Sequence, residues 1–192
     1  EIITYMNEHP DSKFIYISPF LDEAERIAKS CSGLVFVEPS NKIGKYNYVK
    51  CNHIAALINE GRNISSTHQA FLMYTPEMLE KVKEHGYTLI IDENVTAFEN
   101  FDIKPDDIDS AVKAGLLKEE NGVYVPTGKE YNGKMFRGVM RALRSRNLII
   151  AKDNHGAKLY YWTITSEFLT SFSDVFILTY LFKAQSLHHL IQ

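Results

Sequence analysis

The sequence predicts an α/β fold built on a mainly parallel sheet with helices on both faces. Along the first half of the chain, short apolar segments rich in β-branched and aromatic residues alternate with segments of helical spacing. Few polar residues interrupt the apolar segments, which is typical of strands buried on both faces. This alternation indicates successive strand-helix-strand units, and therefore parallel strands.

Five segments are predicted to be strands of this sheet, and turn-forming or polar residues bound each of them. They are residues 12–18 (SKFIYIS), 33–39 (GLVFVEP), 62–68 (RNISSTH), 87–93 (YTLIIDE) and 173–180 (SDVFILTY). The last segment lies far along the chain from the other four, so the intervening residues are predicted to form an insertion.

Four helices are predicted ahead of or between these strands, at residues 1–9 (EIITYMNEH), 21–32 (LDEAERIAKSCS), 53–61 (HIAALINEG) and 75–86 (TPEMLEKVKEHG). The last begins with a Thr cap and Pro and ends in Gly, which are strong boundary signals. Residues 40–52 are a predicted surface loop. Residues 1–9 resemble the second half of a helix and not the start of a domain. We therefore expect the sequence to be a fragment or a trimmed chain.

The predicted organisation is a core over residues 1–93, an insertion over 94–170, and a last core strand with a C-terminal helix over 171–192. The insertion is expected to be α+β. Its predicted helices are residues 103–117 and 133–147, and its strand or hairpin pieces are residues 121–128 and 158–164.

Composition limits the classes of function. The chain has 192 residues, of which 45% are hydrophobic and 23% charged, with a net charge of -3. These values suit a globular protein with a real core, and they argue against wholesale coating of nucleic acid. No uncharged apolar stretch approaches the roughly 18 residues of a membrane span. Two cysteines, Cys31 and Cys51, are too few for a disulfide framework and lack zinc-site spacing, so we expect a cytoplasmic protein.

Asp92 and Glu93 follow a buried strand directly. Because ligands of open parallel sheets bind beyond the carboxyl ends of the strands, this position favours a role in chemistry. One carboxylate can hold Mg²⁺, and the other can orient or deprotonate a water molecule. This is the Walker B arrangement of nucleotide hydrolases. The alternative is a strand that leads into a helix with an acidic first turn.

Three neighbouring segments extend the pattern. The segment FIYISPFLDEAERI resembles motif Ia of superfamily 2 helicases, and RNISSTHQAF resembles the strand-ending Thr-His element that follows it. YTLIIDEN resembles motif II, the DEAD/DEAH box, and VFILTYLF resembles motif III. The four occur in family order. The chain therefore resembles the first RecA-like domain of a DEAD/DEAH-type helicase, of the divergent sort found in phages and prophages.

The resemblance implies roles for particular residues. Asp92 matches the magnesium-coordinating acid and Glu93 the acid that positions water, while Thr179 matches the motif III hydroxyl that couples hydrolysis to strand movement. Ser18 and Pro19, and also Thr67 and His68, match motifs that contact nucleic acid. The implied cofactors are ATP and Mg²⁺. The implied partners are DNA or RNA, single-stranded more than double-stranded, and a second RecA-like domain that supplies an arginine finger.

The chain departs from the family pattern at three places. Asn94-Val95 stands where Ala-Asp or Ala-His is common, and Tyr180 replaces the small residue of motif III. The sequence contains no G-x-x-x-x-G-K-[ST] phosphate loop, which in the family precedes the helix matched here by residues 1–9. A nucleotide would then lack its backbone cradle and its lysine, so this chain alone is not expected to hydrolyse ATP.

Arg137, Arg141 and Arg144 share one side of the predicted helix at residues 133–147, opposite apolar residues. Such a basic side suits contacts with phosphates, and the alternative is a solvated basic surface. Trp162 and its tyrosine neighbours can stack on bases, although core packing is the favoured interpretation.

Two other functions remain open. A non-catalytic module that binds nucleic acid or a partner protein would keep the sheet without the hydrolysis. A different magnesium-dependent phosphoryl-transfer enzyme or nuclease would need a further acid at a strand end, and Asp174 begins its strand instead of ending it. Serine-hydrolase chemistry is unsupported, since no base has the required spacing from Ser65 or Ser66.

Overall fold

A computed structural model describes residues 1–46, 49–93, 98–100, 105–120, 123–131, 133, 136, 140, 148–152, 155–156, 158–163 and 166–179. The chain divides into two compact units. The first comprises Glu1–Val95 and Ser166–Gln192, and the second comprises Thr96–Thr165. The sequence predicts an insertion over 94–170. Helix α8 (Ser166–Leu169), inside that range, groups with the first unit.

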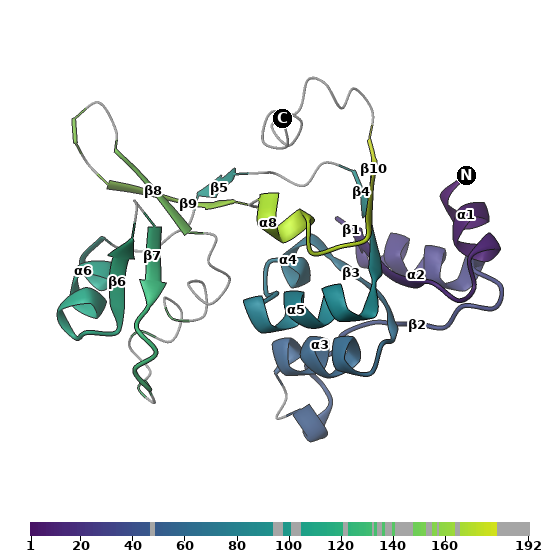
Figure 1. The fold of residues 1–192 in the computed structure, drawn as a ribbon, viewed down its shortest axis with the longest axis horizontal. Coiled ribbons are helices and arrows are strands. Elements are labelled where there is room, and N and C mark those ends of the chain that lie inside the picture. Colours follow the sequence, from purple (N-terminus) through teal and green to yellow (C-terminus); the bar gives the residue numbers. More distant parts are fainter. Residues whose placement is uncertain are drawn as a thin grey trace. The chain divides into compact units, whose positions relative to one another are not determined.

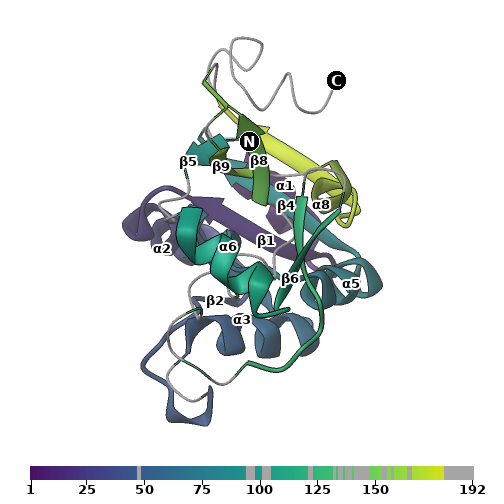
Figure 2. The same ribbon diagram turned by 90° about the vertical axis from the view of Figure 1, so that its left-hand side faces the viewer.

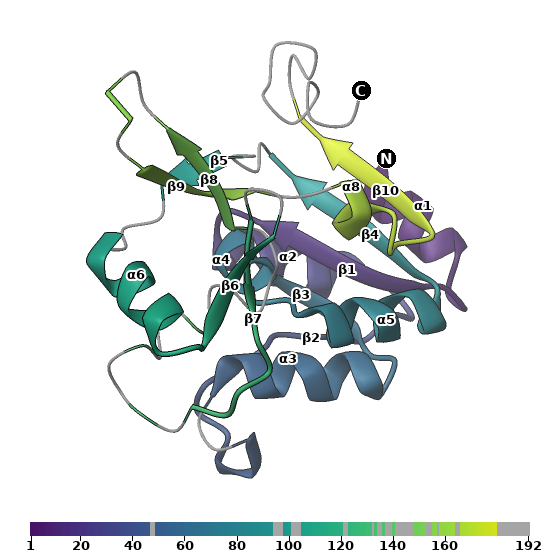
Figure 3. The same ribbon diagram turned by 60° about the vertical axis from the view of Figure 1, so that its left-hand side comes forward.

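The first unit contains a five-stranded sheet in which every pairing is parallel, in the order β10-β4-β1-β3-β2. The strands are β1 (Lys13–Ser18), β2 (Phe36–Val37), β3 (Asn63–Thr67), β4 (Tyr87–Asp92) and β10 (Asp174–Leu178). Figure 3 shows the arrows of β1, β4 and β10 running in the same direction. The predicted α/β class with a parallel sheet is confirmed.

Helices α1 (Ile2–Glu8) and α2 (Leu21–Ser30) cover one face of this sheet. Successive side chains of a strand point to opposite faces, so Phe14 and Tyr16 lie on the same face as their partners Thr88 and Ile90. Met6 of α1 and Ala24 and Ile27 of α2 pack in one core cluster with Phe14, Tyr16 and Ile90.

The other face carries Ile15, Ile17, Leu89 and Ile91, all fully buried. Helices α3 (Lys50–Asn59) and α5 (Pro76–His85) lie on this side, away from α1 and α2 (Figure 1). Buried apolar side chains on both faces explain why the strands are almost continuously hydrophobic.

The ends of α5 follow the predicted signals. Thr75 caps the helix by accepting a hydrogen bond from the N–H of Met78, and Pro76 is its first residue. Gly86 ends it in the left-handed conformation, with φ of 66°, which a residue with a Cβ rarely adopts. The chain then enters β4 at the next residue, so the cap sets the start of the strand that carries Asp92.

Three local predictions were wrong. Residues 40–52 were expected to be a loop, but they contain the 3-10 helix η1 (Gly44–Tyr46) and the start of α3, three residues before the predicted start at His53. Strand β2 has only two residues of the predicted seven. The short helix α4 (His68–Phe71) was not expected, because His68 was assigned to the preceding strand.

The second unit contains an antiparallel sheet in the order β5-β9-β8-β7-β6. Its elements are β5 (Phe98–Asn100), α6 (Pro105–Lys113), β6 (Leu117–Glu120), β7 (Val123–Pro126), β8 (Leu148–Lys152) and β9 (Lys158–Thr163). Figure 2 shows α6 beside β6. Ile108, Ala111 and Leu117 form its core with Tyr124 and Phe136. Strands β5, β6 and β8 were not predicted, and Leu117, the last residue of the predicted helix 103–117, begins β6.

Parts of the predicted insertion lie outside the described residues. They include Arg137, Arg141 and Arg144, as well as the side chain of Trp162; the predicted C-terminal helix after Thr179 lies outside them too. At the start of the predicted arginine helix, the N–H of Met140 donates to the carbonyl of Phe136 at 2.8 Å, which is the spacing of one helical turn. None of the helices in the described ranges has the length and apolar character that a membrane crossing requires.

Candidate functional site

The carboxyl ends of four adjacent strands, β10, β4, β1 and β3, reach the same level at one edge of the parallel sheet. Asp92 pairs with Leu178, and Ser18 pairs with Thr67. The two pairs are at the same level because Ile17 pairs with Ile91, the residues just before Ser18 and Asp92. Each strand therefore delivers its predicted motif to the edge where ligands of open parallel sheets bind.

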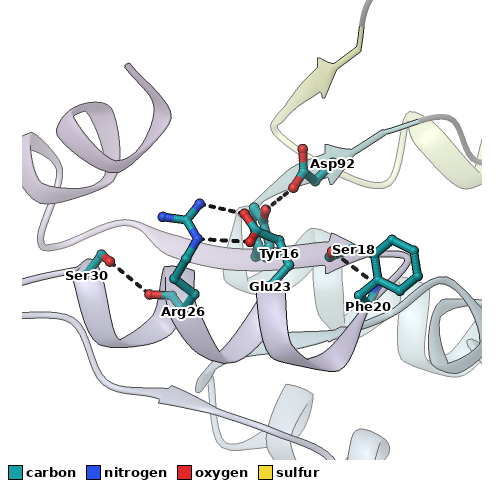
Figure 4. Close-up of polar contacts among 7 residues, drawn as sticks. All are labelled: Tyr16, Ser18, Phe20, Glu23, Arg26, Ser30 and Asp92. Carbon is teal, nitrogen blue, oxygen red and sulfur yellow. Dashed lines mark hydrogen bonds and ion pairs between the residues drawn. The ribbon is translucent and has the colours of Figure 1, made fainter.

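Asp92 is held by a tyrosine that sequence reasoning did not select. The hydroxyl of Tyr16 donates to Oδ2 of Asp92 at 2.5 Å. Tyr16 is fully buried, and Asp92 is half-buried at the end of β4. Burial raises the pKa of Tyr16 far above its ordinary value, and the hydrogen bond to Asp92 raises it further. The hydroxyl therefore stays protonated at neutral pH and acts as a donor. Figure 4 shows the contact.

Glu93 has an unusual backbone. Its φ is 62°, and it is the one non-glycine residue with positive φ in the described part of the chain. Its N–H donates to the carbonyl of Leu178 at 2.9 Å, one step beyond the last paired residues of β4 and β10. Its side chain is exposed, and the half-buried Thr179 follows Leu178. Glu93 and Thr179 thus stand at neighbouring strand ends, as the family pattern implies.

The Ser-Pro turn after β1 differs in accessibility along its length. Ser18 is fully buried, and its Oγ accepts a hydrogen bond from the N–H of Phe20 at 3.4 Å. Its hydroxyl therefore shapes the turn from inside. Phe20 is 66% exposed at the same edge and Leu21 is 46% exposed. Phe20 is an exposed aromatic beside the predicted nucleic-acid motif, and sequence reasoning assigned no role to it, because it lies between the predicted strand 12–18 and the predicted helix 21–32.

Thr67 and His68 connect the end of β3 to the end of β4. Oγ1 of Thr67 accepts a hydrogen bond from the N–H of Ala70 at 3.4 Å and so caps α4. Nε2–H of His68 donates to the main-chain carbonyl of Asp92 at 3.2 Å. A displacement of the Thr67-His68 segment would therefore act on the backbone that carries Asp92.

An ion pair on α2 lies next to the buried tyrosine. Arg26 bonds Glu23 through both its Nε and its Nη2, at 2.9 and 2.5 Å. The hydrogen bond from Arg26 lowers the pKa of Glu23. The charges of Glu23 and Arg26 both act on Tyr16, and they do so in opposite directions (Figure 4). The sequence predicts Glu23 as a first-turn acid of the helix, and it has that position.

The edge offers a divalent cation a partial set of ligands. Within the described ranges, no group of three or more His, Cys, Asp or Glu residues could hold a metal ion. This excludes an all-protein cage from those ranges. Magnesium commonly takes one or two carboxylates and completes its shell with water and substrate phosphates, and Asp92 fits that donor set. Asp174 begins β10, where it pairs with Thr88 near the opposite edge, and so offers no second acid.

Beside the start of α2 and the end of β2 there is a cavity of about 410 Å³. It is lined by Leu21, Glu38, Pro39, Ser40, Asn41, Lys42 and Lys50. Two lysines and one glutamate give its wall a mixed but net positive charge.

Comparison with known proteins gives one informative match. The chain is 31% identical over 194 residues to the "SPbeta prophage-derived uncharacterized protein YonV" of Bacillus subtilis (strain 168). The match covers 96% of this chain and 46% of YonV, so the chain spans about half the length of the relative. No family model matches the sequence. No solved structure matches it either.

Proposed function

We propose that this chain is the first RecA-like motor domain of an ATP- and Mg²⁺-dependent nucleic-acid helicase or translocase. One observation carries the proposal: four adjacent parallel strands bring Ser18, Thr67, Asp92 and the Leu178-Thr179 end to one edge of a sheet. The sequence alone gives only the order of the four motifs along the chain. Their meeting at one edge is what a shared site requires.

In this proposal Asp92 holds the magnesium ion, which supplies charge neutralisation at the phosphates of ATP. Glu93 is exposed beyond the strand end, where its carboxylate can orient the attacking water. The backbone bond from Glu93 to Leu178 fixes this acid beside Thr179. Thr179 is therefore placed to respond when the environment of Glu93 changes.

The nucleic-acid side of the proposal rests on the ends of β1 and β3. Pro19 and the exposed Phe20 present a surface at that edge, while Ser18 supports the turn from inside. The contact from His68 to the carbonyl of Asp92 offers a direct path between a nucleic-acid segment and the metal-binding acid. In the proposal, Arg137, Arg141 and Arg144 are further residues that contact phosphates of the nucleic acid.

The phosphate loop and the second RecA-like domain belong, in this proposal, to a longer natural protein. YonV, of which this chain spans 46%, supports that view, and its printed name supports a phage or prophage origin. The second candidate is a non-catalytic module that binds nucleic acid or a partner on a related fold, and it applies if the full-length natural protein also lacks G-x-x-x-x-G-K-[ST].

The test is ATPase activity, with and without single-stranded DNA or RNA, of this chain and of the full-length natural protein that contains it. We expect stimulated hydrolysis by the full-length protein, lost in Glu93→Gln. Glu84→Gln is the matched control, because Glu84 is an exposed glutamate of α5 whose carboxylate forms a surface ion pair with Lys81. Hydrolysis that survives Glu93→Gln would overturn the catalytic assignment. No hydrolysis at all, with nucleic acid still bound, would establish the binding module instead.

A further inference from the structure

The position of Tyr16 on β1 brings its hydroxyl to the carboxylate of Asp92. Tyr16 pairs with Ile90, which precedes Asp92 by two residues on β4. All three side chains therefore point to the same face of the sheet. Two residues of a strand span about 6.6 Å, and a tyrosine that leans along its strand reaches that far. Phenylalanine in its place would fill the same space and leave the carboxylate without this donor.

The hydrogen bond fixes how the carboxylate is presented. At 2.5 Å it lies at the short end of the range for O–H···O hydrogen bonds. It engages Oδ2, and the structure records no bond from another described residue to Oδ1. A carboxylate held through one oxygen cannot rotate freely, so Oδ1 keeps one direction at the edge of the sheet.

The surroundings of Tyr16 hold it in place. Its ring is fully buried in the cluster that includes Phe14, Ile27 and Ile90. Glu23 and Arg26 of α2 lie near its hydroxyl end (Figure 4). Those two charges bond each other, and the hydroxyl of Tyr16 donates its hydrogen bond to Asp92.

We propose that Tyr16 is a positioning residue: it holds Oδ2 of Asp92 and so orients the carboxylate that would ligate a divalent cation bound together with the nucleotide. This inference rests on the proposed function, since it assumes that Asp92 holds the metal. Groups that hydrogen-bond a metal-ligating carboxylate contribute about 10- to 100-fold to metal affinity or activity. In this fold, the hydroxyl of Tyr16 is the group that hydrogen-bonds the carboxylate of Asp92.

The experiment measures ADP affinity of the full-length natural protein in excess Mg²⁺ and in EDTA. The ratio of the two dissociation constants reports how strongly the protein holds the metal beside the nucleotide. We expect Asp92→Asn to reduce the ratio to about one, and Tyr16→Phe to reduce it by about tenfold or more. ADP affinity in EDTA should stay the same in both variants.

The matched control is Tyr87→Phe. Tyr87 is also fully buried, and its hydroxyl donates to the carbonyl of Arg62 at 2.7 Å, but it starts β4 where Asp92 ends it. Both tyrosine variants remove one buried hydroxyl, so both should lower the thermal midpoint to a similar extent. Only Tyr16→Phe should change the magnesium ratio. A purely structural role for Tyr16 would make the two variants alike in both measurements.

The outcomes separate the inference from the function on which it rests. A ratio that falls in Asp92→Asn and is unchanged in Tyr16→Phe overturns the positioning role and leaves the proposed function standing. A wild-type ratio that is insensitive to Asp92→Asn overturns both. In the double variant, Tyr16→Phe should have no further effect once Asp92 is replaced, because the two residues act through one contact. An additive effect would also contradict the inference.

Discussion

The N–H of Glu93 donates to the carbonyl of Leu178 at 2.9 Å while Glu93 itself has a φ of 62°. Left-handed backbone costs a residue with a Cβ about 1–2 kcal/mol, and such strain gathers at functional sites when surrounding contacts enforce it. Here the enforcing contact comes from β10. The sheet therefore holds the second of the two adjacent carboxylates in a conformation that the isolated chain would avoid.

Relief of this strain should preserve or raise the free energy of unfolding. Glu93→Gly removes the Cβ, so we expect a free energy of unfolding equal to the wild-type value or up to about 1 kcal/mol higher. Glu93→Val adds a β-branched side chain at positive φ and should be about 1–2 kcal/mol less stable than Glu93→Gly. Urea unfolding followed by circular dichroism gives both values. Equal stability of the two variants would show that the left-handed conformation is absent in solution.

Phe20 should contribute to nucleic-acid affinity without contributing much to stability. A base stacked on an aromatic side chain is worth about 1–3 kcal/mol when the aromatic residue is replaced by alanine. We expect Phe20→Ala to weaken binding of fluorescent single-stranded DNA by roughly that amount, measured by anisotropy at fixed salt. Val35→Ala is the matched control, because Val35 is similarly exposed at 68%, against 66% for Phe20. An equal loss in both variants would exclude stacking on Phe20.

The elements that were predicted well are those with complete local signals. Residues 87–93 were predicted as a strand, and β4 spans Tyr87–Asp92. The prediction was accurate because the apolar run ends at two carboxylates, which mark the end of the strand. Helix α5 was placed within one residue at each end by Thr75, Pro76 and Gly86. The start of α3 was missed because the residue before Lys50 is Val49, which gives no N-terminal signal, and no side chain caps that helix.

The site was predictable in its motifs but not in its contacts. Asp92, Ser18 and Thr67 are each identifiable from the residues around them. The hydrogen bond from Tyr16 to Asp92 depends on the register between β1 and β4, which pairs residues that are far apart in sequence. The same holds for His68, whose contact with the carbonyl of Asp92 depends on a short helix fixed by the Thr67 cap. Strand register is set by the whole sheet, so no local pattern discloses it.

Three buried tyrosines predict loss of stability at alkaline pH. Burial is the main cause that raises the pKa values of Tyr16, Tyr74 and Tyr87 well above the ordinary value of about 10. Each hydroxyl keeps its proton in the folded state, so above about pH 10 the folded state binds more protons than the unfolded state, and stability falls as pH rises. Below about pH 10 these hydroxyls are protonated in both the folded and the unfolded state, so their contribution to folding stability is fully present.

The measurement compares two signals during an alkaline titration. We expect a fraction of the tyrosines to ionise only together with the loss of circular dichroism, as followed by absorbance near 295 nm. Tyr87→Phe should reduce the amplitude of that late phase. Ionisation of every tyrosine near pH 10 with the fold intact would contradict the burial of these hydroxyls.

Replacement by alanine should lower the free energy of unfolding at Ser65 of β3 but not at Ser66 of the same strand. Both are buried, but they point to opposite faces of the sheet. Oγ of Ser65 donates to the carbonyl of Ala24 on α2 at 3.1 Å, whereas Oγ of Ser66 is buried with no partner among the described residues. Removal of a satisfied hydrogen bond costs about 0.5–1.5 kcal/mol, and removal of a buried unpaired hydroxyl returns its desolvation penalty.

We therefore expect Ser65→Ala to lower the free energy of unfolding by about 1 kcal/mol, and Ser66→Ala to leave it unchanged or to raise it. The two variants are matched controls for each other, since they remove the same atom from adjacent residues of one strand. Chemical denaturation of both gives the comparison. A loss in Ser66→Ala as large as that in Ser65→Ala would mean that Ser66 has a partner after all, in water or in the rest of the chain, at the strand that carries Thr67 to the candidate site.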